Sequence, residues 1–337
     1  MHRVILVVAI GLAAALIPFA GIAQADDLKI GIIGTDTSHV GAFTELINNP
    51  DNPKHVPGGK VIAAFKGGSP DVESSITRVD KYAEEIQTKY GVKIVDSIEE
   101  LCTMVDAVLL ESVDGRPHLE QARPVFAAKK IIYIDKPIAG TLKDAIEIFR
   151  LSKESGIPTF SSSSYRYYPS MQEVLGKDVG AVRGALSYGP ATHEEHHPGL
   201  FWYGVHATEA LFTVMKTGCE TVVRTETPEF DVVTGTWSGG RIGTLIGLRT
   251  KATPHQVTIF GDKAVAQQQE NPDDSYAPLV VEIMKFFKTK VAPITPQETI
   301  EMFAFMEAAD ESKRQGGAPV KIEDVLKKAL DGKPLPY

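Results

Sequence analysis

The chain has 337 residues, of which 43% are hydrophobic and 23% are charged, and its formal net charge is −8. This composition is that of a globular protein with a sizeable core, and the length suggests about two domains. Acidic and basic residues are interspersed without a basic stripe, which argues against a nucleic-acid partner.

The first 25 residues have the pattern of a signal peptide. Arg3 precedes an apolar stretch from Val4 to Phe19, and Ala23-Gln24-Ala25 forms a small-x-small cleavage site before Asp26. The apolar stretch is shorter than the ~20 residues that a membrane-spanning helix needs. We therefore expect cleavage after Ala25, a periplasmic or secreted protein, and no stable membrane insertion after cleavage.

Residues 26–155 predict a doubly wound parallel sheet of the Rossmann type, because apolar runs of strand length alternate with stretches of helix length. The expected strands cover residues 28–34, 60–65, 92–95, 107–111, 131–134 and 159–161. The expected helices cover residues 41–48, 80–90, 119–127 and 141–155, and a further helix opens at Ser97. Ligands of open α/β folds bind at the carboxyl ends of the strands.

Residues 156–337 predict a second domain of α+β type with a mostly antiparallel open sheet. The expected strands, separated by turn residues, cover 182–188, 222–226, 231–237, 241–248 and 256–260. Helices are expected over residues 207–216 and 296–315, and the second of these is expected to pack at the domain junction. The predicted fold class is therefore α/β.

The first strand ends in a glycine turn that resembles a degenerate dinucleotide fingerprint. Asp36 and His39 stand where the fingerprint has its second and third glycines, and the aspartate adds negative charge where a pyrophosphate would lie. Hydroxyl side chains at the start of the following helix can still donate hydrogen bonds to phosphate. The residues expected around the cofactor are Gly31, Gly34, Thr35, Asp36, Thr37 and Ser38.

The second strand ends in Phe65-Lys66-Gly67-Gly68-Ser69, without the acid that would hold the ribose diol of NAD. Lys66 and Ser69 can instead meet a 2′-phosphate, which favours NADP, but a plain glycine turn explains the segment equally well. Either NAD or NADP is therefore expected. Ser112 and His118 follow the strand over 107–111 and complete the expected cofactor rim.

The run Ile131 to Ile134 ends in Asp135-Lys136-Pro137, which delivers an ammonium group to the carboxyl edge of the sheet. Pro137 removes a backbone donor and fixes the turn, so Lys136 is held out of the sheet. A lysine that only caps a strand is the plain alternative. The glycine turn upstream favours a functional lysine beside a cofactor.

Five segments give the chain a resemblance to the Gfo/Idh/MocA oxidoreductase family over nearly all of residues 28–337: Gly31-Ile32-Ile33-Gly34, Val105 to Leu109, Asp135-Lys136-Pro137, Arg166 and Gly204-Val205-His206. The resemblance implies a nicotinamide-binding domain followed by a substrate domain that forms homo-oligomers. It implies that Lys136 and His206 are catalytic, with the lysine near nicotinamide and substrate and the histidine in proton transfer. It further implies an NAD(P)-dependent oxidoreductase acting on the CH–OH groups of a carbohydrate or cyclitol.

The chain departs from the family around His206, because Trp202 stands where many members carry an aspartate four residues earlier. Glu209, one helical turn later, is expected to orient the histidine instead. Trp202 and Tyr203 offer ring faces on which a sugar can stack. The expected substrate-binding residues are Arg166, His197, Trp202, Tyr203 and Glu209.

The segment His193-Glu194-Glu195-His196-His197-Pro198 has the residue types of a transition-metal site, but its spacing fits no helical metal motif. A solvated loop is favoured, so no metal is expected, and His197 beside His206 is a further alternative. Cys102 and Cys219 are far apart in the sequence and are expected to be buried and separate.

Export constrains the chemistry, because free nicotinamide cofactor is scarce outside the cytoplasm. A tightly bound cofactor, regenerated within each cycle, satisfies this constraint. Two other functions remain open: a carbohydrate-modifying eliminase or glycosidase-like enzyme, with or without a metal, and a carbohydrate-binding protein that kept the fold without turnover.

Overall fold

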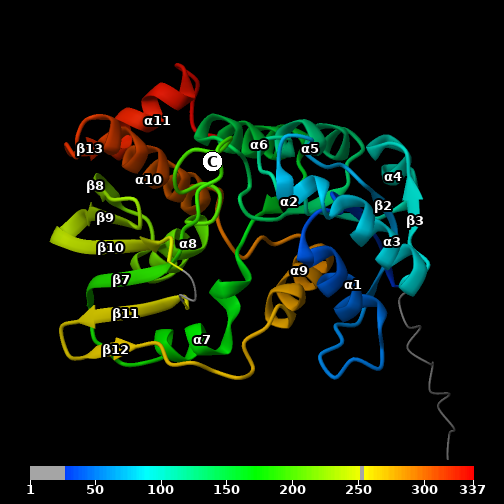
Figure 1. Ribbon diagram of the computed structural model, residues 1–337, viewed down its shortest axis with the longest axis horizontal. Helices are drawn as coiled ribbons and strands as arrows, with labels where there is room; N and C mark the ends of the chain where they lie inside the picture. The colour runs from blue at the N-terminus through cyan, green and yellow to red at the C-terminus, as the bar shows by residue number, and fades with distance from the viewer. Residues whose placement is uncertain (1–26, 251–253) are drawn as a thin grey trace, which may run out of the picture.

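The computed structural model describes residues 27–250 and 254–337, which form two sheets with helices around and between them (Figure 1). The expected signal peptide, residues 1–25, lies outside the described residues. Within the described part, no helix is both long enough and apolar enough to span a membrane.

The first sheet has six parallel strands in the order β3-β2-β1-β4-β5-β6. These are β1 (Leu28–Ile33), β2 (Gly59–Phe65), β3 (Lys93–Val95), β4 (Ala107–Leu110), β5 (Ile131–Ile134) and β6 (Thr159–Phe160). Every strand expected in this half is present, and the predicted Rossmann-type sheet is confirmed. The strand order reverses between β1 and β4, which opens a crevice at their carboxyl ends.

Helices cover both faces of this sheet, as the apolar strands require. Alternate residues of β4 point to opposite sides: Leu109 joins one apolar cluster with Phe43, and Leu110 joins another with Phe126. The helices are α1 (Ser38–Asn48), α2 (Glu73–Ile76), α3 (Val79–Tyr90), α4 (Ile98–Met104), α5 (His118–Ala127) and α6 (Leu142–Ser155). Helix α1 begins earlier than expected because the Thr37 side chain caps it.

The second sheet has seven strands in the order β12-β11-β7-β10-β9-β8-β13. These are β7 (Val182–Pro190), β8 (Cys219–Glu226), β9 (Phe230–Trp237), β10 (Arg241–Leu248), β11 (Gln256–Gly261), β12 (Val265–Gln267) and β13 (Val320–Lys321). Strands β7 and β10 are parallel and the other neighbours are antiparallel, so the sheet is mostly antiparallel, as predicted. The short helix α7 (Pro169–Leu175) precedes this sheet.

Three helices connect the second sheet with the rest of the molecule. Helix α8 (Val205–Met215) packs on β7, and α10 (Pro296–Arg314) packs between β8 and α6. Helix α11 (Ile322–Leu330) follows at the C-terminal end (Figure 1). Through α10, one apolar cluster runs continuously from the first sheet to the second.

Helix α9 (Ala277–Thr289) was not expected from the sequence, and it returns from the second sheet to the first domain. It lies beside α1 (Figure 1), where Leu279, Ile283 and Phe286 are fully buried with Phe43 and Phe160. A boundary at residue 155 therefore separates neither the two sheets nor the two packed units, because β6 still belongs to the first sheet and α9 completes the core of the first unit.

The cysteine prediction is confirmed. Cys102 lies on α4 and Cys219 begins β8, and both are buried and unpaired. Burial raises the pKa of the Cys102 thiol to about 11, so this thiol stays protonated and unreactive at neutral pH.

Candidate functional site

A cavity of about 430 Å³ lies between the two domains, at the carboxyl end of the first sheet. Residues that follow β1, β4 and β5 line one side, and residues before α8 and α9 line the other. The predicted site residues that line it are Thr37, Ser38, Lys136, Trp202, Tyr203 and His206. Both residues predicted to be catalytic therefore share one cavity.

Lys136 follows β5 and reaches this cavity beside an ionised carboxylate. Its Nζ lies 3.6 Å from Oδ2 of Asp135, and the same oxygen lies 2.6 Å from Nδ1 of His39. Burial alone would raise the pKa of Asp135, but the charges of His39 and Lys136 hold it below its ordinary value. The site thus contains a buried anion between two cationic or basic groups.

His206 lies on the first turn of α8, and its Nδ1 is 2.7 Å from Oγ of Ser163. Burial, followed by the nearby charges of Lys136, His255 and His39, lowers the pKa of His206 well below its ordinary value. The imidazole is therefore neutral at neutral pH, which is the state that exchanges a proton with a substrate hydroxyl.

Glu209 and Arg166 were expected at the substrate, but in the structure these two buried side chains pair with each other. Glu209 Oε1 accepts a hydrogen bond of 2.7 Å from Nε of Arg166, whose Nη2 lies 2.7 Å from Glu298. Glu209 also accepts hydrogen bonds from Ser162 Oγ and the Ser163 backbone. It therefore acts on His206 only through Ser163, because its own oxygens are occupied by buried donors.

The glycines of the turn after β1 are required by close packing, and they do not leave an open phosphate site. A Cβ on Gly34 would lie 2.3 Å from the Ser112 backbone nitrogen, and the residue has a φ of +87°. A Cβ on Gly31 would meet Leu101, so this glycine admits α4 rather than a cofactor. The Asp36 carboxylate is fully buried and accepts hydrogen bonds from Ser75 Oγ and the Val113 backbone at 2.6 and 2.9 Å.

Four more residues expected at the cofactor are occupied elsewhere. The Thr35 hydroxyl donates to the carbonyl oxygen of Val79, and exposed Lys66 pairs with Asp80. Ser112 Oγ donates to Gln121. His118 is fully buried, with ring nitrogens near the carbonyl oxygens of Ser112 and Ile138. These side chains have partners of their own, and none of the four lines the cavity.

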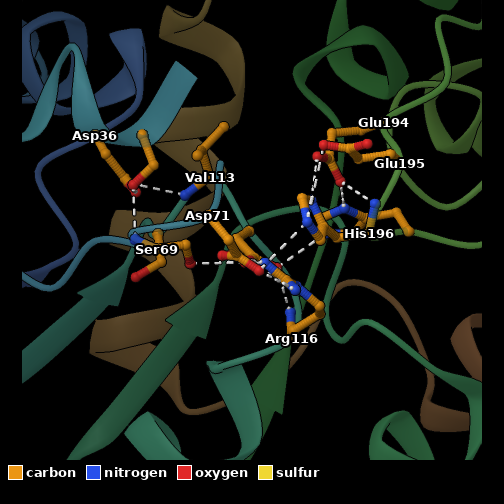
Figure 2. A network of polar contacts seen from close by, with 12 residues as sticks. Asp36, Ser69, Asp71, Val113, Arg116, Glu194, Glu195 and His196 are labelled. Carbon is orange, nitrogen blue, oxygen red and sulfur yellow. Dashed lines mark hydrogen bonds and ion pairs between the residues drawn. The ribbon is translucent and has the colours of Figure 1, made fainter. Parts of the chain in front are cut away.

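A polar network ties the loops after β2 and β4 to the second domain (Figure 2). Its members are Ser69, Asp71, Asp114, Arg116, Glu194, His196 and His197. Arg116 binds Asp71 through two bonds of 2.8 Å, and Asp114 accepts from Ser69 at 2.6 Å. Ser69 is thus a member of this network and does not line the cavity.

His197 closes the same network instead of reaching the substrate cavity. Its Nε2 lies 2.9 Å from Asp114, its Nδ1 contacts Glu194, and its ring lies 4.7 Å from that of Trp202. The side chain is fully buried behind Trp202. Its role in the structure is to join the two domains.

The histidine-rich segment does not converge on one metal position. His196 and His197 both turn to Glu194, whereas His193 lies near Asp231. In the described residues, the ligand atoms of His193, Glu226 and Asp231 lie within 4.8 Å of one another. However, Asp231 pairs with Arg224 and Arg249, and Glu226 pairs with Arg224 and Lys313, so both carboxylates already have positive partners.

Sequence reasoning missed several ring side chains that line the cavity, and four of them are His39, Tyr165, His255 and Tyr276. His39 carried a signal, since it occupies a glycine position of the fingerprint at the start of a helix. The other three gave none, because they come from irregular segments that only the fold brings to the cavity. Burial lowers the pKa of His255 to about 4, so it too is neutral.

Glu111, directly after β4, is a buried acid whose two carboxyl oxygens have no hydrogen-bond partner among the described residues. Burial first, and then the charge of Asp135, raises its pKa well above the ordinary value. The unfolded chain releases this proton near pH 4.3, so Glu111 lowers stability as the pH rises above that value.

Replacing Glu111 by glutamine should therefore stabilise the protein increasingly from pH 5 to pH 8, by about 1–3 kcal/mol at the upper end. Urea unfolding at several pH values measures the effect, and Glu99→Gln on the exposed face of α4 is the control. A Glu111→Gln variant that is less stable than wild type at pH 8 would show that the carboxylate has a partner in solution.

Comparison with known proteins agrees with this geometry. Residues 28–162 match the family described as oxidoreductases with an NAD-binding Rossmann fold, Gfo/Idh/MocA. A curated 4-carboxy-2-hydroxymuconate-6-semialdehyde dehydrogenase from a Sphingobium species is 32% identical over 129 residues. That match covers 37% of this chain and 39% of the relative's length.

Solved structures resemble the whole two-domain arrangement. A probable dehydrogenase from Thermotoga maritima superposes with a TM-score of 0.72 at 18% identity, covering 88% of this chain and 100% of the other. A Lactobacillus casei myo-inositol dehydrogenase, solved with NAD(H) and myo-inositol, superposes with a TM-score of 0.69 at 15% identity, covering 88% and 96%. At such identities the likeness establishes the fold of both domains. Residues 28–162 therefore form a domain that matches the NAD-binding Rossmann fold of the Gfo/Idh/MocA oxidoreductase family.

Proposed function

We propose that the protein transfers hydride reversibly between NAD or NADP and a secondary hydroxyl of a sugar, glycoside or cyclitol. The observation that carries this proposal is the shared cavity of Lys136 and His206 beside the N-terminus of α1. The inositol dehydrogenase among the structural neighbours supports a polyol substrate. We further propose an exported homo-oligomer whose cofactor stays bound and is regenerated in each cycle.

The cavity residues fit the phosphates and the nicotinamide half of a dinucleotide. Ser74 Oγ is buried without a hydrogen-bond partner among the described residues, and Arg78 makes no ion pair with any of them. Both line the cavity beside the start of α1, where helix N–H groups bind phosphate. Asp36 opposes this fit, since its carboxylate stands at a glycine position of the fingerprint.

The chemistry that a bound nicotinamide supplies is the acceptance and return of hydride. Lys136 would donate a hydrogen bond to the reacting oxygen and stabilise its developing negative charge. His206 would exchange the proton of that oxygen, because the Ser163 hydroxyl on its Nδ1 can donate or accept as the ring changes tautomer. Trp202 and Tyr203 would stack on the apolar face of the ring.

Native mass spectrometry of gently purified protein, followed by titration with NAD(H) and NADP(H), tests this function. We expect a bound dinucleotide, or binding on addition, and its reduction by a polyol from a panel of sugars and cyclitols. If the purified protein holds no dinucleotide and binds none on addition, a carbohydrate-binding protein is favoured. Calorimetry with the same panel of sugars and cyclitols would then detect the binding.

Replacing Asp36 by glycine should tighten NAD(H) binding by about tenfold, or ~1.4 kcal/mol. The substitution restores the fingerprint and removes a carboxylate near the pyrophosphate. Ser75→Ala is the control, because it removes the hydrogen bond to Asp36 and keeps the charge. Calorimetry measures both variants, and weaker binding to Asp36→Gly would mean that the carboxylate organises the loop for the cofactor.

A further inference from the structure

His39 faces the cavity with a ring that is held in one orientation. It lies on the first turn of α1 and lines the cavity together with Lys136 and His206. Its ring stacks on Phe43 at 5.1 Å between centroids and meets the edge of Tyr276 at 4.7 Å. The histidine that replaces a glycine of the fingerprint is therefore held in place by two aromatic rings.

The tautomer of His39 is fixed by Asp135. Nδ1 lies 2.6 Å from Oδ2 of the aspartate, and the two side chains are only 7% and 1% exposed. An ionised carboxylate accepts hydrogen bonds and cannot donate them, so the ring proton lies on Nδ1. In the neutral state of the ring, the lone pair on Nε2 is then left for the cavity, which is how a buried aspartate prepares a histidine base.

His206 differs from His39 because its partner is a hydroxyl. Ser163 Oγ already accepts a hydrogen bond from the Tyr165 backbone at 3.2 Å, and its own proton can go to Nδ1 of His206 at 2.7 Å. In that state Nε2 of His206 carries a proton and can donate to a carbonyl oxygen. One cavity therefore combines a fixed base from the first domain with a donor from the second, and Lys136 adds a positive charge.

We infer that His39 is a second catalytic base, positioned by Asp135, that removes a proton from the carbon next to the carbonyl of a bound polyhydroxy ketone. This inference rests on the proposed function, which supplies such a ketone by oxidation of a hydroxyl. A base that shares a cavity with neutral and cationic hydrogen-bond donors can catalyse enolisation, because the donors stabilise the enolate oxygen.

The step needs no oxidant or reductant. The C–H bond breaks and its proton moves to Nε2 of His39. The electron pair forms the C=C bond of an enolate, and the carbonyl π electrons move to oxygen, where Lys136 and His206 donate hydrogen bonds. Return of the proton from His39 to the same face restores the ketone, and protonation of the opposite face would give its epimer. The cavity therefore has the groups for enolisation, and for elimination when a leaving group stands on the next carbon.

Hydrogen–deuterium exchange of 2-keto-myo-inositol in D₂O tests this step without added nicotinamide. Proton NMR follows the loss of the C–H signals next to the carbonyl. We expect the wild-type protein to exceed the protein-free rate, and His39→Gln and Asp135→Asn to lower the enzymatic rate by about 10²-fold or more. His55→Gln, on the loop after α1, is the matched control and should exchange like wild type.

The outcomes separate this inference from the proposed function. Wild-type exchange at the protein-free rate, or undiminished exchange by His39→Gln, overturns the inference even if dinucleotide binds. Exchange that depends on His39 in a protein that binds no dinucleotide supports the inference and overturns the proposed redox function.

Nitrogen NMR of ¹⁵N-histidine protein gives a first readout that needs only the wild-type protein. The wild-type spectrum should show His39 protonated on Nδ1, and Asp135→Asn should move the proton to Nε2 while the ring stays in place. A wild-type His39 protonated on Nε2 would overturn the assignment.

Discussion

Alanine in place of His206 should lower the turnover of a polyol substrate by about 10²–10⁴-fold while dinucleotide remains bound. The imidazole is neutral because its pKa is far below the ordinary value, so it is ready to exchange a proton near pH 7. It lines the cavity with Lys136, and Ser163 holds its other nitrogen. Steady-state kinetics and a parallel dinucleotide titration measure the two quantities separately.

His55→Ala serves as the control for this variant, since His55 contacts the Ile47 carbonyl oxygen away from the cavity. The lowered pKa also predicts that wild-type kcat/KM shows no fall near pH 6.5 from His206, because this ring accepts a bulk proton only at lower pH. Full turnover by the His206→Ala variant would show that His206 takes no part in the reaction.

Replacing Arg166 by methionine should lower the free energy of unfolding by about 3–5 kcal/mol. The guanidinium is buried between Glu209 and Glu298, and its loss leaves two carboxylates without their counter-charge. Burial alone would lower the pKa of Arg166, but these two carboxylates raise it, so the arginine stays charged. Urea unfolding measures the loss.

Arg123→Met is the matched control for Arg166. Arg123 pairs with Glu120 on the exposed face of α5, where loss of an ion pair changes stability by no more than about 0.5 kcal/mol. Equal losses for the two variants would contradict the buried role of Arg166. If Arg166→Met instead weakens the affinity for the polyol without loss of stability, Arg166 contacts the substrate, as the sequence predicted.

Local features of the sequence were sufficient to predict the architecture. The alternation of apolar runs and helix-length segments gave the parallel sheet, because strands buried on both faces must be apolar throughout. The glycine turn after β1 and the Asp135-Lys136-Pro137 turn after β5 placed Lys136 at the carboxyl edge. Since strand ends meet at one edge, the lysine necessarily faced the crevice.

The sequence was a poor guide to polar partners, because side chains far apart in the chain compete for the same buried donors and acceptors. Glu209 is one helical turn from His206, yet the fold gives its oxygens to Arg166 and to Ser162 and Ser163. Buried polar atoms take whichever partners the packing brings within reach. Sequence spacing does not contain that information.

The chain by itself therefore determined the two-domain fold, the family that the first domain matches, and the positions of Lys136 and His206 at one cavity. Only the tertiary structure decided that His39 and Asp135, 96 residues apart, form a pair, because it brings the start of α1 against the end of β5. The tertiary structure likewise packs α9 against the first domain and brings Asp36 into a hydrogen bond with Ser75. Periodicity and turn chemistry encode elements locally, whereas the pairing of buried charges depends on which elements the topology makes neighbours.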